Sequence, residues 1–256
     1  MQITPTEVPQ PYQRDIPLEL PPGLVVEEYP LEGPPDMEPL TFIPLQASQA
    51  AILARHTSER EAFFPDNSFF TSGHFAMRVD FGAGELVAGA DELFAIENFD
   101  QDGREGWASV ERNGEEIYRI DVGPGSPIPT LRGLWAYGDH WLLETARITR
   151  REEGNMIYSD AIGQVSQDGE LLNSLLGYEE MFGLQLMAGK PFYFFKQDGL
   201  IHLAYDGQVV ETGYDEIPHY GCCSAGALNP RRAANMVAFF ASRDGVWYYV
   251  ETGVFE

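Results

Sequence analysis

The chain has few basic residues: 16 of its 256 residues are Lys or Arg, against 40 Asp or Glu, so its net charge is −24. Affinity for nucleic acid depends on neutralising phosphates with Lys and Arg, and electrostatic attachment to anionic lipid needs the same side chains. We therefore expect no nucleic-acid partner and no attachment of this kind to lipid. An acidic surface is compatible with cations, with neutral glycans, or simply with solubility.

Cysteine is almost absent as well. The two cysteines, Cys222 and Cys223, are adjacent, a spacing that is neither a disulfide framework nor a zinc finger. Neighbouring side chains of a strand point to opposite faces, so two adjacent thiolates do not easily hold one metal ion. Three alternatives stay open: a vicinal disulfide, two inert core thiols, or a redox or metal site assisted by His219.

Long apolar runs and catalytic motifs are also missing. No stretch approaches the roughly 20 apolar residues that cross a bilayer, so we expect no membrane insertion. The sequence contains no G-x-S-x-G, H-E-x-x-H, P-loop or G-x-G-x-x-G pattern. These absences favour a binding protein over an enzyme.

Proline is concentrated at the N-terminus, where residues 1–44 hold eleven of the 18 prolines. Proline fixes φ and removes a backbone donor, so residues 1–45 should form an extended tether. Residues 4–11, Thr-Pro-Thr-Glu-Val-Pro-Gln-Pro, resemble the spacer after the lipidated cysteine of bacterial lipoproteins. That resemblance implies an extracellular or cell-surface location and a lipid anchor in the full-length precursor. The alternative is an ordinary flexible N-terminus.

The next segment, residues 46–68, is expected to hold one short helix and a connection. Residues 46–64 contain several alanines, which favour a helix, and Pro65 stops it. From residue 69 to residue 256 we expect one repeated antiparallel β-domain.

Four stretches of this β-domain align with one another: residues 84–121, 131–173, 183–212 and 222–251. In each, apolar and aromatic runs are separated by Asn-Gly, Asp-Gly or similar turns, which are strong hairpin signals. The expected strands include residues 84–90, 140–146 and 170–173, and residues 229–230 are an expected turn. The period of about 40 to 50 residues is typical of propeller blades. The sequence therefore predicts an all-β, small β-propeller-like array of about four to five antiparallel blades. A twisted β-sandwich is the alternative.

The fourth stretch ends after its third strand, so its sheet would need a strand from elsewhere. Closed propellers protect such an open edge with the other end of the chain. Residues 24–29, 40–45 or 75–81 could provide this strand.

Basic side chains recur at equivalent places of the repeat. In a propeller, the turns between second and third strands lie on the same face as the starts of the inner strands. A ligand-binding funnel on that face would include Arg104, Arg132, Arg150, Arg151, Lys196, His219, Tyr220 and Arg243. The plainer interpretation is that hairpin turns are simply polar.

One acidic loop is a candidate metal site. Asp100, Asp102 and Glu105 surround a glycine, and Ca²⁺ prefers several oxygen ligands from one sharply turned loop. The loop lacks the later glutamate of a calcium-binding loop, so an acidic β-turn is the simpler alternative.

These patterns predict a secreted or surface-anchored, non-enzymatic binding domain for an unknown small-molecule, glycan or protein ligand. One alternative is an enzyme that acts on an extracellular glycan through a pair of carboxylates in the funnel. Another is a protein–protein interaction module, which would expose an apolar patch.

Overall fold

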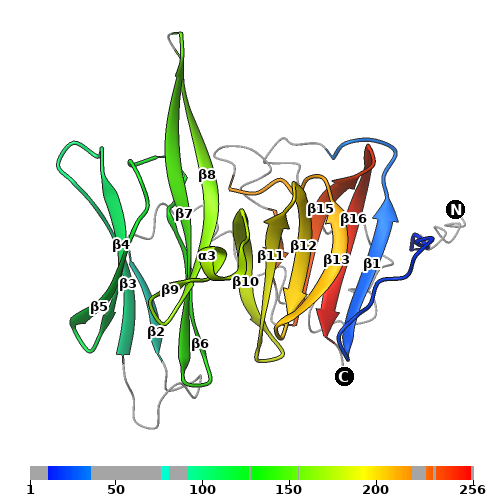
Figure 1. Ribbon diagram of the computed structural model, residues 1–256, viewed down its shortest axis with the longest axis horizontal. Helices are drawn as coiled ribbons and strands as arrows, with labels where there is room; N and C mark the ends of the chain where they lie inside the picture. The colour runs from blue at the N-terminus through cyan, green and yellow to red at the C-terminus, as the bar shows by residue number, and fades with distance from the viewer. Residues whose placement is uncertain are drawn as a thin grey trace, which may run out of the picture. The chain divides into compact units, whose positions relative to one another are not determined.

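The computed structural model describes residues 11–35, 76–80, 92–126, 128–154, 156–220, 229–232 and 235–254. Most of these residues are in β-strands, which form four sheets of four strands each (Figure 1). Every strand pair whose register is known is antiparallel. The expected all-β class is therefore confirmed.

The four sheets follow one another along the sequence. The first has the order β2 (Ala76–Asp80), β3 (Glu92–Phe99), β4 (Gly106–Arg112), β5 (Glu115–Asp121). The second has the order β6 (Leu131–Tyr137), β7 (His140–Glu153), β8 (Met156–Gln167), β9 (Glu170–Leu171), and helix α3 (Leu172–Leu176) follows it. The third has the order β10 (Glu180–Met187), β11 (Lys190–Gln197), β12 (Leu200–Tyr205), β13 (Gln208–Tyr214). The fourth has the order β1 (Leu24–Pro30), β16 (Val246–Val254), β15 (Met236–Arg243), β14 (Arg231–Arg232).

The chain divides into two compact units. One comprises residues 1–66 and 208–256, and the other comprises residues 67–207. We call them the terminal unit and the central unit and describe each by itself.

The hairpin turns follow from their dipeptides. Six two-residue turns have positive φ at both positions, with φ of 49° to 54° at the first residue and 74° to 91° at the second. Such angles define a type I′ turn, which matches the twist of the flanking strands and favours Asn or Asp followed by Gly. The six are residues 113–114, 168–169, 188–189, 198–199, 206–207 and 244–245. All were predicted as turns, and these predictions are confirmed.

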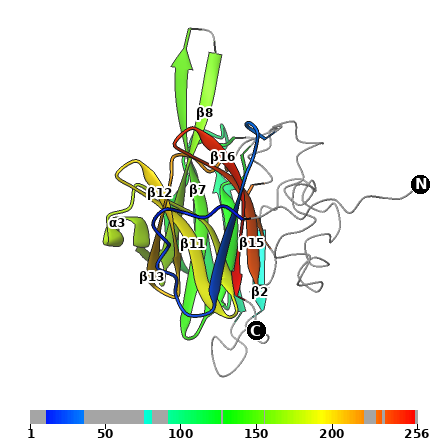
Figure 2. The ribbon, with the colours of Figure 1, turned by 90° about the vertical axis from the view of Figure 1, so that its right-hand side faces the viewer.

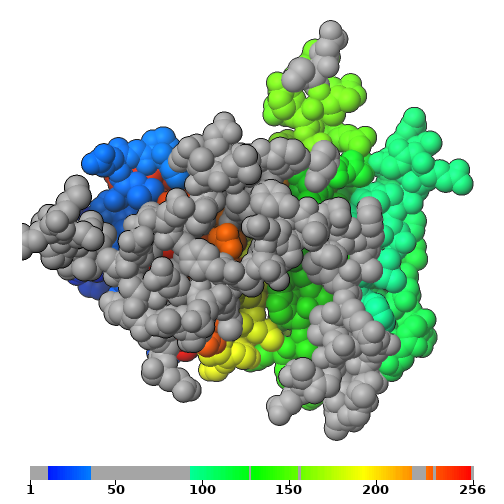
Figure 3. All heavy atoms as spheres, turned by 180° about the vertical axis from the view of Figure 1, so that it is seen from behind, coloured from blue at the N-terminus to red at the C-terminus, as the bar shows by residue number. Residues whose placement is uncertain are grey.

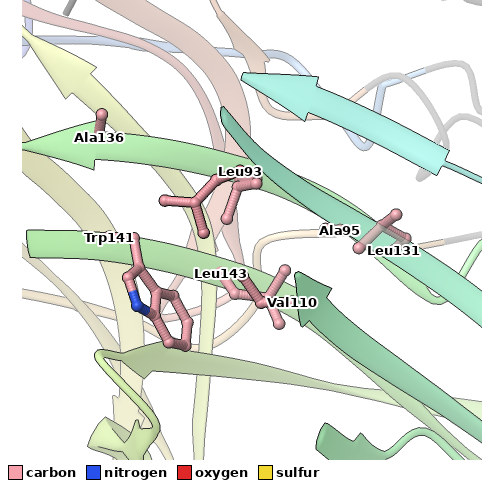
Figure 4. Close-up of a cluster of buried hydrophobic side chains, with 8 residues drawn as sticks. Leu93, Ala95, Val110, Leu131, Ala136, Trp141 and Leu143 are labelled. Carbon is pink, nitrogen blue, oxygen red and sulfur yellow. The ribbon is translucent and has the colours of Figure 1, made fainter. Parts of the chain in front are cut away.

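In the central unit, residues 141–146 of β7 in the second sheet are buried on both faces. Trp141 and Leu143 of β7 pack with residues of the first sheet (Figure 4). Leu142, between them, packs with Val165 and with the third sheet's Phe195. Because alternate residues of a strand point to opposite faces, a strand covered on both sides has a continuous apolar run.

The terminal unit joins a strand from the start of the chain to the last sheet. Strand β1 pairs with β16 along its whole length, from Leu24 opposite Val254 to Pro30 opposite Tyr248. Of the three segments considered for this position, residues 24–29 therefore occupy it. Strand β2, from the third candidate segment (residues 75–81), pairs instead with β3. Residues 40–45 lie outside the described part of the chain.

One local expectation is wrong in part. Residues 170–173 were expected to be a strand, but β9 ends at Leu171 and α3 follows. The buried Asn173 side chain makes the hydrogen bonds to β8 that the backbone of a neighbouring strand would make. Its Nδ2 donates to the Gly163 carbonyl at 3.0 Å, and its Oδ1 accepts from the Val165 N–H at 2.9 Å. At residues 229–230, expected to be a turn, the chain bends at Pro230. The Asn229 side chain bonds β15 in the same manner as Asn173 bonds β8, through both the N–H and the carbonyl of Phe240.

The longest hairpin is also longer than expected. Strand β7 was predicted to end at Ala146, but it continues to Glu153 and pairs with β8 throughout. The outer part of this hairpin projects as a two-stranded ribbon (Figures 1 and 2). We call residues 147–153 and 156–162 the arm.

The helix expected at residues 46–64 and the strand expected at residues 84–90 lie outside the described residues. The same is true of residues 222–228, which include both cysteines.

Candidate functional site

A buried carboxylate lies at the centre of the terminal unit. Glu28, on β1, is only 4% exposed and accepts hydrogen bonds from three side chains. Arg14 donates from Nε at 2.9 Å and from Nη2 at 2.5 Å. Arg243, at the end of β15, donates from Nη1 at 2.9 Å and from Nη2 at 3.2 Å. The Tyr214 hydroxyl donates at 2.5 Å. We call these four residues the Glu28 cluster.

The cluster attaches residues 11–20, which we call the N-terminal segment, to β1 of the fourth sheet. The Tyr12 N–H donates to the Glu28 carbonyl at 2.6 Å, and Arg14 Nη1 donates to the Thr212 carbonyl at 3.0 Å. The Arg243 guanidinium lies 4.8 Å from the ring centre of Tyr248 and 5.7 Å from that of Tyr12. Aromatic faces stabilise a partly desolvated cation, so the rings help to hold Arg243 in place.

The electrostatics of the cluster favour its ionised form. Burial by itself would raise the pKa of Glu28, but hydrogen bonds from Arg14, Arg243 and Tyr214 outweigh it, and the pKa lies below its usual value. Burial, followed by the charge of Glu28, raises the pKa of Tyr214 well above its usual value. Burial opposes the charge of Arg243, yet bonding to Glu28 raises its pKa. These directions favour an ionised Glu28, a neutral Tyr214 and a charged Arg243.

A groove runs between the N-terminal segment and β1. Its volume is about 390 Å³, within the range of small-ligand sites. Seven of its twelve lining residues are proline or aliphatic: Pro11, Pro17, Leu18, Leu20, Leu24, Val25 and Val26. The other five are polar or charged: Tyr12, Gln13, Arg14, Glu27 and Glu28. Arg14 and Glu28 pair with each other, so the proline and aliphatic residues of the lining are left to contact an extended ligand.

The edge of β1 lies along this groove. The Leu31 N–H donates toward β16, to the Trp247 carbonyl, whereas the Glu28 carbonyl accepts from Tyr12 on the other side. Backbone groups alternate sides along a strand, so Val26, like Glu28, directs its N–H and carbonyl away from β16. Within the described residues, no hydrogen bond occupies these two groups of Val26.

Two carboxylates face each other across β1 and β16. Glu27 lies opposite Glu251, and Tyr29 lies opposite Tyr249. Each carboxylate accepts a hydrogen bond from the tyrosine on its own strand, at 2.5 Å for Glu27 and 2.7 Å for Glu251. Directly opposed residues have Cβ atoms about 5 Å apart, which allows their carboxyl groups the separation of about 5 Å found in retaining glycosidases. Glu251, however, has no exposed surface to meet a substrate.

In the central unit, the predicted funnel residues occur on several elements. Arg104 lies in the β3–β4 turn, Arg132 in β6, Arg150 and Arg151 in β7, and Lys196 in β11. Arg150 and Arg151 were expected in a turn but belong to a strand, because the arm is longer than predicted.

One loop brings the Arg104 turn and Arg150 together. Arg150 Nη2 donates to the Gly125 carbonyl at 2.5 Å, and the Gly125 N–H donates to the Gly103 carbonyl at 3.0 Å. Arg151 instead contacts Glu153, Asp160 and the Tyr158 ring on the arm itself.

In the terminal unit, the three predicted residues have different surroundings. Arg243 belongs to the Glu28 cluster. A ring nitrogen of His219 donates to the Ile217 carbonyl at 2.6 Å, and its ring packs at 4.7 Å on Tyr220, which is 5% exposed. A common funnel for all eight residues stays a prediction.

The acidic loop uses one of its carboxylates to hold the turn. Asp100 Oδ1 accepts from the backbone N–H groups of Arg104 at 2.6 Å and Glu105 at 3.2 Å. Among the described residues, no group of three or more His, Cys, Asp or Glu side chains is placed to hold a metal ion. Calcium binding by Asp100, Asp102 and Glu105 stays a prediction.

Sequence inspection missed another buried carboxylate, Glu144. It is fully buried in β7 and accepts from the N–H groups of Gly183 at 3.0 Å and Leu184 at 2.9 Å. The register of β10 on β11 shifts between Phe182 and Gln185, and a bulge of this kind takes backbone donors out of the ladder. The sequence did contain a signal for a buried carboxylate, because Glu144 is a charged residue inside the apolar run that begins at Trp141.

Comparison with known proteins finds no family model, no curated protein and no solved structure that matches this chain. Within the part of the chain that is described, no helix is both long and apolar enough to span a membrane.

Proposed function

We propose that this protein is a non-enzymatic binding module, and that it binds an extended polypeptide segment in the groove beside β1. The groove is the observation that carries the proposal, because it combines an apolar lining with an available strand edge. A polypeptide can add to such an edge through backbone hydrogen bonds, while its side chains fill the adjoining pocket. Val26 supplies one donor and one acceptor for this contact.

The Glu28 cluster supports this proposal by fixing one wall of the groove. Arg14 and Tyr12 tie the N-terminal segment to β1 and β13, so the wall is ordered before a ligand arrives. A preformed site avoids the entropic cost of ordering a loop on binding. Among the alternatives, catalysis by Glu27 and Glu251 is less well supported because Glu251 is buried.

The scaffold is part of the proposal. Four successive four-stranded sheets, the last completed by β1, are the arrangement expected of a four-bladed propeller. We propose that the sheets form such a ring, with β1 as the closing strand. The resemblance of residues 4–11 to a lipoprotein spacer supports a place for this module at the cell surface or outside the cell.

The binding proposal is tested by selecting phage-displayed peptides on the wild-type protein. Enriched peptides are then measured by calorimetry on two variants. Val26→Pro removes the outward N–H but no hydrogen bond to β16, whereas Val26→Thr keeps the N–H and the branched shape. We expect binding to the wild type and to Val26→Thr, with at least a tenfold loss for Val26→Pro.

Two outcomes would reject the proposal. One is a selection that enriches no peptide, and the other is equal affinity of an enriched peptide for wild type and Val26→Pro. A parallel screen on a neutral-glycan array tests whether the ligand is a glycan instead. Binding to glycans on the array, with no enriched peptide, would favour a glycan ligand over a polypeptide.

A further inference from the structure

The arm leaves part of a strand edge open. In β8, the N–H groups of Gly163 and Val165 point away from β7, because they donate to the side chains of Glu180 and Asn173. Alternation along the strand places the backbone groups of Ile157, Ser159 and Ala161 on the same outward side. Among the described residues no hydrogen bond occupies them.

This open edge has little of the usual protection. Natural edge strands carry proline, charged side chains, a bulge or a covering segment, which prevent another strand from pairing with them. Of these, residues 157–161 have one charged side chain, Asp160. Here the pairing of β8 with β7 is regular from Met156 to Gln167. Ile157 is 65% exposed, and Tyr158 and Ile162 are each about 40% exposed. Figure 3 shows the hairpin projecting with its side chains at the surface.

The arm is also electrically neutral in a strongly acidic chain. Its charged residues are three arginines and three carboxylates: Arg147, Arg150, Arg151, Glu152, Glu153 and Asp160. Two copies of a chain with a net charge of −24 repel each other over most of their surface. A neutral, projecting arm is a place where two copies can meet with little local repulsion.

The sequence of the edge is complementary to itself. In an antiparallel pair centred on a two-fold axis at Ser159, Ile157 of one copy lies opposite Ala161 of the other, and the outward backbone groups of both strands face one another. Tyr158 then lies opposite Asp160 of the other copy, where its hydroxyl can donate to the carboxylate. Arg151, which already lies over the Tyr158 ring at 5.4 Å, adds a positive charge beside that carboxylate.

We propose that the arm is a self-association site, at which β8 of one copy pairs antiparallel with β8 of a second copy about Ser159. The contact is limited to residues 157–161, because Glu180 and Asn173 occupy the edge from Gly163 onward. It is therefore smaller than a standard interface of about 1,600 Å², and the dimer is weak and concentration-dependent. This proposal is independent of the groove.

Sedimentation equilibrium from about 10 µM to 1 mM covers the affinity range of weak complexes. We expect the average mass of the wild type to rise from 28.6 kDa toward twice that value. Ser159→Pro removes the central outward N–H without affecting the bonds to β7 and should remain monomeric. Ser159→Thr keeps the N–H and should dimerise like the wild type, and circular dichroism confirms that both variants are folded.

A crosslinking measurement tests the register. Under mild oxidation Ser159→Cys should form a covalent dimer, since directly opposed Cα atoms of a hydrogen-bonded pair are about 5.5 Å apart. Glu153→Cys, at the far end of the arm, and the wild type should not. A wild type that stays monomeric at the highest concentration would overturn the proposal, as would a Ser159→Pro variant that dimerises as strongly as the wild type.

Discussion

Replacing Glu28 by glutamine tests whether the Glu28 cluster holds the N-terminal segment in place. The carboxylate accepts hydrogen bonds from Arg14, Arg243 and Tyr214 while only 4% exposed. A glutamine offers one acceptor oxygen and turns two N–H donors toward the guanidinium groups. Removing one partner of a buried ion pair costs roughly 3–5 kcal/mol, because the remaining charge is buried without compensation. We expect Glu28→Gln to lower the free energy of unfolding by about that amount.

The arginines should matter less than the glutamate. Arg14→Met leaves Glu28 paired with Arg243 and Tyr214, so only Arg14's own hydrogen bonds are lost, at a cost of roughly 1.5–3 kcal/mol for bonds to a charged group. A surface pair provides the control. Arg119 is 55% exposed beside Glu116, and Arg119→Met should change stability by less than about 1 kcal/mol.

Acidity gives a second readout of the same site. The pKa of Glu28 is lower in the folded protein than in the unfolded chain. Its contribution is therefore complete above the unfolded pKa and is lost as the pH falls through the folded pKa. We expect the free energy of unfolding of the wild type to fall on acidification below about pH 4.5, and Glu28→Gln to lack this part of the decrease.

Urea unfolding followed by far-ultraviolet circular dichroism measures these differences, at neutral pH and along an acid series. The reasoning is wrong if Glu28→Gln unfolds within about 1 kcal/mol of the wild type, or if Arg14→Met is the more damaging change. An unchanged acid dependence in Glu28→Gln would likewise show that other carboxylates cause the loss of stability.

Two other predictions concern the scaffold. Glu144→Ala leaves the buried N–H groups of Gly183 and Leu184 without this acceptor, which costs roughly 1–3 kcal/mol for each group. Hydrogen exchange of these two amides should therefore accelerate. Unchanged exchange rates would show that Glu144 does not stabilise the β10 bulge. The proposed ring predicts a compact particle with a radius of gyration of about 18 Å in small-angle X-ray scattering, and a clearly larger radius would indicate an open array of sheets.

The sequence predicts the described strands largely because their signals are local. Asp-Gly and Asn-Gly dipeptides need positive φ at two successive residues, and few other structures provide it. Apolar runs such as that beginning at Trp141 mark a strand covered on both faces. The arm was underestimated for a related reason: residues 149–153 are polar on both faces, and only their pairing with β8 identifies them as a strand.

The polar sites depend on contacts that no local pattern encodes. Glu28 and Arg243 are 215 residues apart, and the sequence gives no reason to choose this pair among many carboxylates and arginines. Arg243 was selected as a ligand-binding residue because it lies beside a turn, whereas the structure shows it bonded to Glu28. Asn173 is similar, since its amide completes an edge that exists only after β8 has folded.

The two binding proposals rest on one physical rule. A strand edge exposes donors and acceptors that must be satisfied by water, by side chains or by another strand. The side chains of Glu180 and Asn173 accept hydrogen bonds from the outward N–H groups of Gly163 and Val165 in β8. In β1, the Tyr12 N–H donates to the outward carbonyl of Glu28. Residues 157–161 and Val26 lie just beyond those contacts, where the described chain provides no such cover. We therefore expect other chains to bind at these two strand edges, where the outward backbone N–H and carbonyl groups have no partner among the described residues.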